Sequence, residues 1–350
     1  MALTRRGRRV VAIGGAASLL IAVIVWVAMS GGDNPLTNTL KTLTGNTTPP
    51  PPPCPLTGLQ PLGGKTVPQR PVLAVKVDNT ASAYPLAGLD KADVLYEELV
   101  EGGITRFMGV FQCQDSGRVG PVRSARTTDP RVLLQYGKEP LIAYSGGQLA
   151  VVNLLDRSGL FGLTEDSAPG GFTRDTTRIA PYNLFVNTPA LYGLAKKTVK
   201  RDGVSDPVFT YSTDAPKGRA VRAVAIDFSS SSIAQWSWLG GRWVRMLDGA
   251  PMKLEDGKAL TVDNILIQQV VVTESNLVDV LGNHSPDVTL TGKGKAWLLR
   301  NGKLIEGSWS RKKLSDVTVF RTKQGQAFVL TPGTTFVELA PKSQAVTFGH

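Results

Sequence analysis

The distribution of apolar residues divides the chain into an anchor-like run, a polar stretch and two folded regions. The uncharged run Val10–Met29 has 20 residues, enough for an α-helix to cross a hydrocarbon core of about 30 Å. Residues 31–53 show no apolar periodicity and end in five consecutive prolines. The pattern predicts a basic cytoplasmic segment at 1–9, a transmembrane anchor at 10–30, a Thr/Pro-rich linker at 31–53 and folded domains at 54–205 and 206–350.

The first folded region mixes strand and helix patterns. The apolar run Val72–Val77 ends in Asp78 and Asn79, which is typical of a buried strand with polar residues at its end. Two further strands at 93–101 and 104–113 are expected to join at a two-residue turn, Gly102–Gly103. A strand is also expected at 140–144, and helices are expected at 128–136, 148–156 and 189–200.

The second folded region is rich in strand patterns. Nine short segments between Val221 and Leu339 have strand character, and Asn301–Gly302 between two of them is a strong hairpin signal. We therefore predict an α+β fold, in which a mixed α/β domain precedes a small antiparallel β-rich domain. The second domain is expected to be a sandwich or a barrel.

The flanks of the N-terminal apolar run indicate the orientation of the chain. Arginines at positions 5, 6, 8 and 9 place its N-terminal side in the cytoplasm, so that everything after Gly31 is exported. A cleaved signal peptide is the alternative, because small residues stand at Ala28 and Ser30. Both readings predict an extracytoplasmic protein, and the anchor reading predicts a single-pass cell-membrane protein.

The net charge narrows the class of partner. The full chain carries 39 Lys and Arg against 28 Asp and Glu. Removing 1–53 takes away five basic residues and one acidic residue, which leaves 34 against 27, or +7. This excess suits a negatively charged cell-wall polymer or membrane surface, although ordinary solubilising surface charge explains it equally well. No basic run is interleaved with aromatic residues, so no nucleic-acid partner is expected.

The two cysteines, Cys54 and Cys113, are an even count for an oxidising compartment. We predict that they form a disulfide between the start of the first domain and the end of its second hairpin strand. In the chain-entropy model a loop of about 60 residues contributes around 4 kcal/mol of stability.

Several kinds of chemistry are excluded by what the chain lacks. It has only two histidines, His284 and His350, and histidine is the commonest general base and metal ligand. Neither a Walker A loop nor the dinucleotide-binding, nucleophile-elbow or EF-hand motifs are present. We expect no cofactor and no metal site, and any catalysis has to rest on carboxylates or other side chains.

The segment 93–126 concentrates buried-strand character and charge. A turn at Gly102–Gly103 would place Glu97, Glu101 and Arg106 on one face of the hairpin, with Arg106 diagonally between the two glutamates. Charges among apolar neighbours indicate either a partly covered ligand pocket or a plain cross-strand ion pair. Both interpretations stay open.

Further candidate ligand-binding residues follow along the chain. Arg123 and Arg126 lie in the loop GRVGPVRSAR, and arginine suits bidentate recognition of carboxylate or phosphate. Their alternative role is pairing with the hairpin glutamates. Asp78 and Asn79 end the first buried strand. A later charged loop, FTRDTTRIAPYN, adds the two remaining candidates, Arg178 and Asn183.

Several of these segments together resemble the YerB-like lipoprotein family of Gram-positive bacteria. The matching stretches are CPLTGL (54–59), RPVLAVKVDNT (70–80), GLDKADVLYEELVEGGITRFMGVFQ (88–112), GPVRSAR (120–126), RIAPYNLF (178–185), GKGKAWLLRNGKLIEGSWSR (292–311) and LTPGTTFVELAP (330–341). The resemblance implies a membrane-attached envelope protein of two domains and supplies no activity. Family members often carry a lipobox, whereas this chain has prolines before Cys54.

These observations favour a membrane-anchored extracytoplasmic binding or scaffolding protein, contacting a cell-wall polymer or an envelope protein through the charged pocket of the first domain. The alternative is a hydrolase acting on an envelope glycan, with two of Asp78, Glu97, Glu98 and Glu101 as acid and base. A purely structural role for the charged cluster is the third possibility.

Overall fold

The computed structural model describes residues 51–350 except 62, 64, 138, 199–204 and 206. The predicted cytoplasmic segment, the anchor at 10–30 and nearly all of the linker therefore lie outside the described residues. Within the described part of the chain, no helix combines the length and the apolar character needed to cross a membrane.

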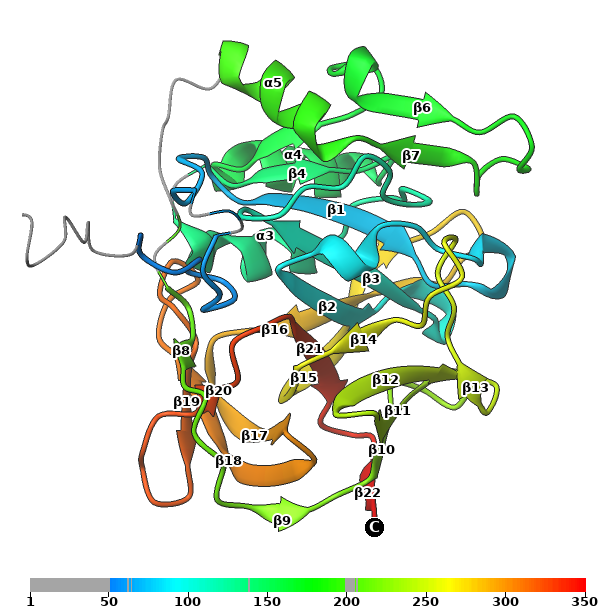
Figure 1. The fold of residues 1–350 in the computed structure, drawn as a ribbon. Coiled ribbons are helices and arrows are strands. Elements are labelled where there is room, and N and C mark those ends of the chain that lie inside the picture. The colour runs from blue at the N-terminus through cyan, green and yellow to red at the C-terminus, as the bar shows by residue number, and fades with distance from the viewer. Residues whose placement is uncertain (1–50, 62, 64, 138, 199–204, 206) are drawn as a thin grey trace, which may run out of the picture. The chain divides into compact units, whose positions relative to one another are not determined.

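A twelve-stranded sheet is the centre of the molecule (Figure 1). Its main path runs β19-β18-β17-β15-β21-β2-β3-β1-β4-β5, with β16 beside β15 and β9 beside β18. The strands are β1 Leu73–Asp78, β2 Val94–Leu99, β3 Thr105–Phe111, β4 Leu141–Ala143, β5 Phe161–Leu163, β9 Arg219–Ala220, β15 Asn264–Val278, β16 His284–Thr289, β17 Gly292–Arg300, β18 Lys303–Arg311, β19 Val319–Thr322 and β21 Thr335–Pro341.

Smaller sheets and short helices complete the fold. A six-stranded sheet contains β10 Ala223–Asp227, β11 Ile233–Leu239, β12 Arg242–Leu247, β13 Ala250–Pro251, β14 Thr261–Val262 and β22 Val346–Gly349. Two strand pairs are β6 Phe172–Arg174 with β7 Leu184–Val186, and β8 Thr210–Tyr211 with β20 Val329–Leu330. The helices are α3 Thr128–Leu133, α4 Leu149–Ser158 and α5 Thr188–Thr198, and the 3-10 turns are η2 Ala81–Ala83, η3 Leu89–Lys91, η4 Glu101–Gly103, η5 Leu134–Tyr136 and η6 Pro169–Gly171.

The described chain is thus mixed α/β, with many strands and few helices, as the patterning predicted. The description of residues 206–350 as purely antiparallel is wrong, because β20 pairs with β8 in parallel. In addition, β21 lies between β15 and β2 and is parallel to both. It therefore joins the two predicted domains in one continuous sheet. The domain boundary at 205/206 stays a prediction.

Each face of the large sheet covers a hydrophobic core, because side chains alternate along every strand. In β2, Leu95 packs in one core with Trp236 and Trp243 of the six-stranded sheet, and Tyr96 packs in the other with Val132 of α3. The short strands β1 to β4 are buried on both faces, which explains why their sequences are largely apolar and do not alternate with polar residues. A charged side chain inside these strands has to find its partner within the protein.

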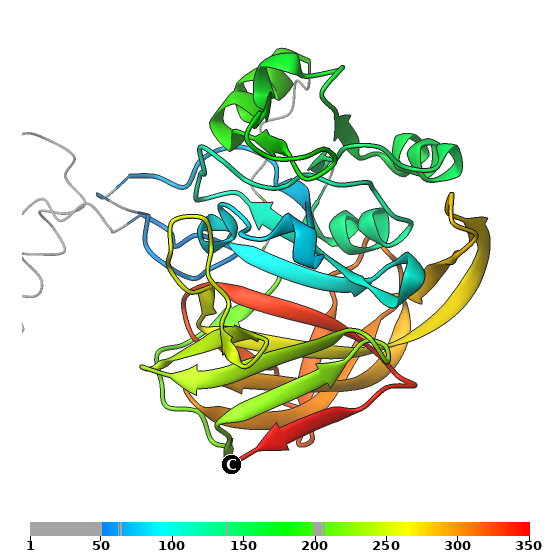
Figure 2. The same cartoon turned by 90° about the vertical axis from the view of Figure 1, so that its right-hand side faces the viewer.

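Strand β15 continues past the sheet and forms a curved arm with β16, seen in yellow and gold at the right of Figure 2. The arm contacts the helical side of the molecule. Arg131 of α3 pairs with Asp287, with 2.5 Å between Nη2 and Oδ1, and Gln148 donates to the Ser285 hydroxyl at 3.1 Å. These contacts bring residues of the second folded region beside the first region's charged loop.

The hairpin prediction at Asn301–Gly302 is confirmed. β17 and β18 pair up to Arg300 opposite Lys303, which leaves a two-residue turn. Both turn residues have positive φ, 49° at Asn301 and 67° at Gly302. This is the combination that a type I′ turn requires and that Asn-Gly favours.

Candidate functional site

The hairpin of β2 and β3 has a register different from the predicted one. Glu98 lies opposite Arg106 and Leu99 lies opposite Thr105. The loop contains three residues rather than two, because the Val100 N–H donates to the Ile104 carbonyl at 2.8 Å and Glu101–Gly103 form the turn η4.

A shift of one residue moves every side chain of one strand to the other face of a sheet. Arg106 therefore shares its face with Glu98 and not with Glu97, and the predicted grouping of Glu97 with Arg106 is wrong. Seven of the nine predicted site residues fall instead into two clusters on opposite faces of β1, β2 and β3. We call them the arginine cluster and the Glu97 cluster.

The arginine cluster consists of Asp78, Glu101, Arg106, Arg123 and Arg126. Arg123 Nε lies 2.7 Å from Asp78 Oδ2, and Arg126 Nε donates to Glu101 Oε2 at 2.6 Å. The remaining Glu101 oxygen accepts from the Ser285 hydroxyl on the arm at 2.5 Å. Both acids are therefore already engaged by one arginine each.

Arg106 has the longest ion-pair distance of the three arginines in this cluster. It is 5% exposed, and its nearest carboxylate oxygen, Asp78 Oδ2, is 3.9 Å from Nη1. Among the described residues neither Nε nor Nη1 of Arg106 has a hydrogen-bond acceptor. Burial, together with the charges of Arg126 and Arg123, lowers the pKa of Arg106 to about 10. Within the described part of the chain, the arginine cluster thus holds a buried guanidinium with two nitrogens that lack an acceptor.

A fully buried triad lies on the same face beside the arginine cluster. Lys76 Nζ forms an ion pair with Glu98 and lies 2.8 Å from Asp129 Oδ1. Burial raises the pKa of Glu98 to about 7. Burial alone would lower the pKa of Lys76, but the charges of Asp129 and Glu98 raise it overall. Glu98 and Asp129 are therefore the ion-pair partners of Lys76, and they do not neutralise Arg106.

The loop around Arg123 is held by backbone contacts. Ser145 N–H donates to the Arg123 carbonyl at 3.0 Å, and Ala125 N–H donates to the Gly146 carbonyl at 3.1 Å. Gly146 has φ +80°, and a Cβ added there would lie 3.2 Å from the Ser124 hydroxyl oxygen. The side chain of Arg123 is 21% exposed, so the arginine cluster reaches solvent at this loop.

The Glu97 cluster lies on the opposite face and draws its partners from distant sequence. Arg245 of β12 donates to Glu97 through Nη1 at 2.6 Å and Nη2 at 3.2 Å, and Nη1 also donates to Glu338 Oε1 at 3.2 Å. The rings of Phe107, Trp236 and Phe336 have their centroids 5.4 to 5.9 Å from Arg245 Cζ. This cluster places its guanidinium between two carboxylates and three aromatic rings.

Glu338 and Glu97 lie side by side on the parallel strands β21 and β2. Burial is the main cause that raises the pKa of Glu338 well above its ordinary value, and the charge of Glu97 adds to it. Trp236 Nε1 donates to Glu338 Oε1 at 2.6 Å. One arginine, Arg245, is therefore shared by the two acids.

Asn79 connects the Glu97 cluster to the surface. Its Nδ2 donates to Glu97 Oε1 at 3.1 Å and to Thr105 Oγ1 at 2.6 Å, and its Oδ1 accepts from the Tyr84 hydroxyl. The Thr105 hydroxyl also donates to Glu97 Oε1 at 2.6 Å. These residues line the floor of an open cleft of about 690 Å³.

The last two predicted residues, Arg178 and Asn183, belong to neither cluster. Arg178 donates to the carbonyls of Ala83 and Pro85 and stacks with its Cζ 5.2 Å from the Phe185 ring centroid. Asn183 accepts from Arg174 Nη1 at 3.1 Å. They fasten the charged loop against the neighbouring segments.

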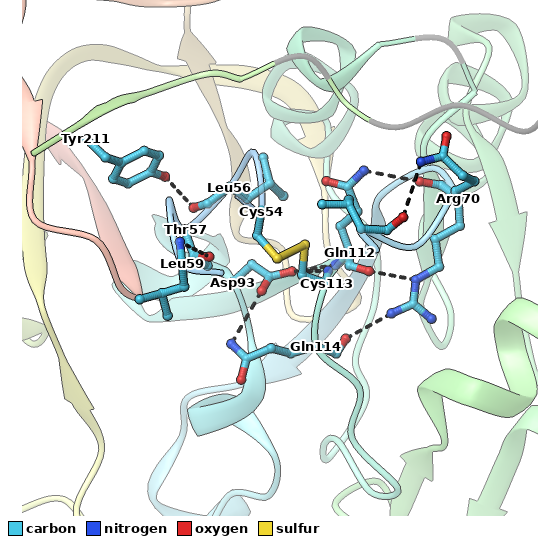
Figure 3. The surroundings of a disulfide bond; sticks show 12 residues. Cys54, Leu56, Thr57, Leu59, Arg70, Asp93, Gln112, Cys113, Gln114 and Tyr211 are labelled. Carbon is cyan, nitrogen blue, oxygen red and sulfur yellow. Dashed lines mark hydrogen bonds between the residues drawn. A yellow bond between two sulfur atoms is a disulfide. The ribbon is translucent and has the colours of Figure 1, made fainter. Parts of the chain in front are cut away.

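The predicted disulfide is present and joins Cys54 to Cys113, with 6.1 Å between Cα atoms and 59 residues of sequence separation (Figure 3). Beside it, the backbone N–H groups of Gln112 and Cys113 donate to Asp93 Oδ2 at 2.6 and 2.8 Å. Burial nevertheless raises the pKa of Asp93 to about 6. Figure 3 also shows Arg70 bound to the same segment, where Nε donates to the Gln112 carbonyl at 2.7 Å.

The residues that sequence reasoning missed are Lys76, Tyr84, Thr105, Asp129, Arg245, Ser285 and Glu338. Two of them could have been recognised in the sequence as charges inside buried strands, since Lys76 interrupts the apolar run VLAVKV and Glu338 interrupts TFVELA. A charge inside a buried strand predicts a partner but does not identify it. The described residues contain no group of three or more His, Cys, Asp or Glu side chains that could hold a metal ion.

The fold and these clusters define a mixed α/β protein with buried ion-pair networks on both faces of its central sheet. Two family models match the chain: the N-terminal domain of a protein of unknown function (DUF3048) at residues 56–203 and the C-terminal domain at 224–337. The chain belongs to this DUF3048 family.

One relative is known both as a sequence and as a solved structure. The chain is 29% identical over 307 residues to the "Putative lipoprotein YerB" of Bacillus subtilis (strain 168), covering 84% of this chain and 87% of the relative. The crystal structure of YerB from Bacillus subtilis superposes with a TM-score of 0.71 at 26% identity, covering 84% of this chain and 99% of that chain. The expected resemblance to YerB-like lipoproteins is confirmed.

Proposed function

We propose that this protein is an extracytoplasmic binding protein of the bacterial cell envelope, attached to the membrane at its N-terminus, which holds an anionic group of an envelope component in the arginine cluster. The name of its lipoprotein relative supports the location, as do the N-terminal apolar run and the Cys54–Cys113 disulfide, a bond typical of oxidising compartments.

The observation that carries the proposal is Arg106. A buried guanidinium without hydrogen-bond acceptors at Nε and Nη1 is costly, because it has lost water without gaining a partner. Arg123 and Arg126 lie beside it, and among the described residues the ion pairs of these three arginines involve two carboxylates, Asp78 and Glu101. An added phosphate or carboxylate supplies the missing negative charge and acceptors.

A cell-wall polymer that carries phosphate fits this site better than a neutral one. Arginine binds phosphate oxygens bidentately, and the net charge of +7 after residue 53 attracts a polyanion over longer range. The attraction is expected to weaken with salt, since the Debye length shrinks from about 10 Å at 0.1 M to about 3 Å at 1 M.

The structure does not favour the alternative glycan hydrolase. Asp78, Glu97 and Glu101 are each paired with an arginine, and Glu98 is paired with Lys76. A general acid or base needs a lone pair or proton that reaches the substrate. All four of these carboxylates are buried, and each lies in an ion pair.

The test is calorimetric titration of the full chain, in a neutral polyoxyethylene ether detergent, with poly(glycerol phosphate). We expect binding that weakens with salt and that falls at least tenfold in Arg106→Met. The control is Arg222→Met, an exposed arginine whose loss changes the net charge equally. Equal binding by wild type and Arg106→Met, or no binding by wild type, would falsify the proposal.

A further inference from the structure

The cleft above the Glu97 cluster lies on the face of the sheet opposite the arginine cluster and has a different chemical character. Its volume of about 690 Å³ falls in the range of about 300 to 1,000 Å³ that is usual for ligand sites. Residues from β2, β3, β11 and β12 and from the loops beside these strands line it, so the strands position much of its wall.

The floor of this cleft is polar but fully engaged. Glu97 accepts hydrogen bonds from Arg245, Asn79 and Thr105, and Tyr84 donates to Asn79. Burial, with the nearby carboxylates of Glu97, Asp78 and Asp248 adding to it, raises the pKa of the Tyr84 hydroxyl, so this hydroxyl keeps its proton at neutral pH. A charged ligand gains little from a floor whose charges already cancel.

The rim, in contrast, offers free hydrogen-bonding groups. Among the described residues, the side chains of Ser230, Ser232, Gln235 and Asp248 line the cleft and have no hydrogen-bond or ion-pair partner there. Three of them, Ser230, Gln235 and Asp248, are exposed. Hydroxyl, amide and carboxylate groups together provide both donors and acceptors, as the hydroxyls of a sugar require.

Apolar surface lies among these polar groups. Ile233 is 51% exposed and Leu247 is 37% exposed, and Met246 lies between Leu247 and the buried Arg245. Gln235 and Met246 are direct cross-strand neighbours. The alternation of polar groups with apolar patches matches a sugar ring, which has hydroxyls at its edge and C–H groups on its faces.

A second hollow of about 500 Å³ is lined by Gly103 and Ser229, and the next residue, Ser230, lines the first cleft. Ser229 Oγ donates to the Gly103 carbonyl at 2.6 Å, which holds this segment against the β2–β3 loop.

We propose that the cleft lined by Tyr84, Gln235 and Asp248 binds an uncharged segment of a glycan chain. The site is separate from the arginine cluster and does not depend on the anion proposed there. Asp248 accepts hydrogen bonds from ligand hydroxyls at the rim, Gln235 exchanges hydrogen bonds with them, and Ile233 and Leu247 pack against the ring.

The experiment titrates the full chain with the β-1,4-linked tetramer of N-acetylglucosamine, in the same polyoxyethylene ether detergent because this detergent carries no sugar. We expect a saturable heat of binding in wild type that falls at least tenfold in Asp248→Asn and in Gln235→Ala. Asp248 has φ 51°, and asparagine tolerates this left-handed conformation well, so the substitution preserves the turn.

The matched control is Ser237→Ala, two residues from Gln235 on β11, which does not line the cleft. It should bind the tetrasaccharide as wild type does. Arg106→Met should also bind normally, so that the two sites fail independently. Absence of tetrasaccharide binding in wild type, or unchanged binding in both rim variants, would overturn the proposal. Competition by the diamine putrescine would overturn it as well, because the rim would then select cations.

Discussion

The two charged clusters lie on opposite faces of the same three strands and differ in how their charges are satisfied. In the Glu97 cluster one buried guanidinium has two carboxylates and three aromatic rings around it. In the arginine cluster, three guanidiniums face two carboxylates, and among the described residues the ion pair of Arg106 is the longest, at 3.9 Å to Asp78. The charges of the first arrangement are balanced by close partners, whereas the second has an excess of positive charge to which we propose that an anion binds.

This contrast separates stability from binding. A buried ion network in which every charge has a partner is sensitive to the loss of any one side chain. The loss leaves a buried charge without a partner, which destabilises the folded state. A buried charge that lacks a partner contributes little to the folded state and is retained for another reason. Four substitutions test the contrast, in order of expected effect.

The largest effect is expected for Arg245→Met. Removing this guanidinium leaves Glu97 and Glu338 adjacent and without a cation, so the free energy of unfolding should fall by about 3 to 5 kcal/mol. Urea denaturation followed by tryptophan fluorescence measures it. Arg242→Met, on the same strand but 44% exposed at its side chain, should change stability by less than about 1 kcal/mol. A small loss in Arg245→Met would contradict the view that this cluster is structural.

A second effect concerns pH and the triad beside the arginine cluster. The folded-state pKa of Glu98 is about 7, above its unfolded value of 4.5. The folded state therefore favours the protonated acid, and stability falls as pH rises from about 4.5 to about 7, by about 3 kcal/mol in total. Glu98→Gln should remove this part of the decline, measured by urea denaturation at several pH values.

Asp93 provides a background for the same measurement. Its pKa is raised from 3.8 to about 6, which produces a similar decline over a lower pH range in wild type and variant alike. The informative quantity is therefore the difference between wild type and Glu98→Gln. If the two pH profiles run parallel from pH 4.5 to 7, Glu98 does not titrate in this window.

A smaller effect, of opposite sign, is expected for Arg106→Met. In this variant Asp78 Oδ2 still has Arg123 Nε at 2.7 Å, and Asp78 Oδ1 still accepts from the Thr80 N–H at 2.7 Å. The substitution therefore leaves no carboxylate without a partner. Stability should stay the same or rise by up to about 2 kcal/mol, because an unsatisfied buried charge is removed. Thermal and urea unfolding measure this. A loss of more than about 2 kcal/mol would show that Arg106 belongs to a structural network instead.

The smallest effect is expected for Glu338→Gln. The pKa of Glu338 is raised well above its ordinary value, which favours the neutral acid, and the amide reproduces its acceptor for Trp236 and Arg245. Stability at pH 7 should change by less than about 1 kcal/mol. Urea denaturation measures it. A large loss at neutral pH would mean that Glu338 is ionised, which would make the two acids a pair of charges.

Much of the local structure followed from the sequence because its causes are local. Three features could be predicted: the Asn301–Gly302 hairpin, the helix around Asp129 and the Cys54–Cys113 bridge. Turn residues and helix-start residues act over short distances, and two cysteines allow only one pairing. The β2–β3 register was not, because a three-residue loop with two left-handed glycines replaced the expected two-residue turn. That single residue reassigned Glu97 and Arg106 to different faces.

The candidate site shows the same limit. Glu97 and Arg106 were recognised as charges needing partners, yet the partner of Glu97 is Arg245, 148 residues away. No local pattern connects these positions. Their meeting depends on β21 entering the sheet beside β2 in parallel and on the six-stranded sheet covering that face.

By itself, the sequence determined many of the strands and helices and which cysteines pair, although it missed strands such as β11 and β22. It also indicated that charged side chains inside apolar strands need partners. The tertiary structure decided which partners they have. Alternation along a strand fixes two faces but not their neighbours, and the neighbours come from packing between segments that are distant in the chain. This packing satisfies the guanidinium of Arg245 and leaves that of Arg106 unsatisfied.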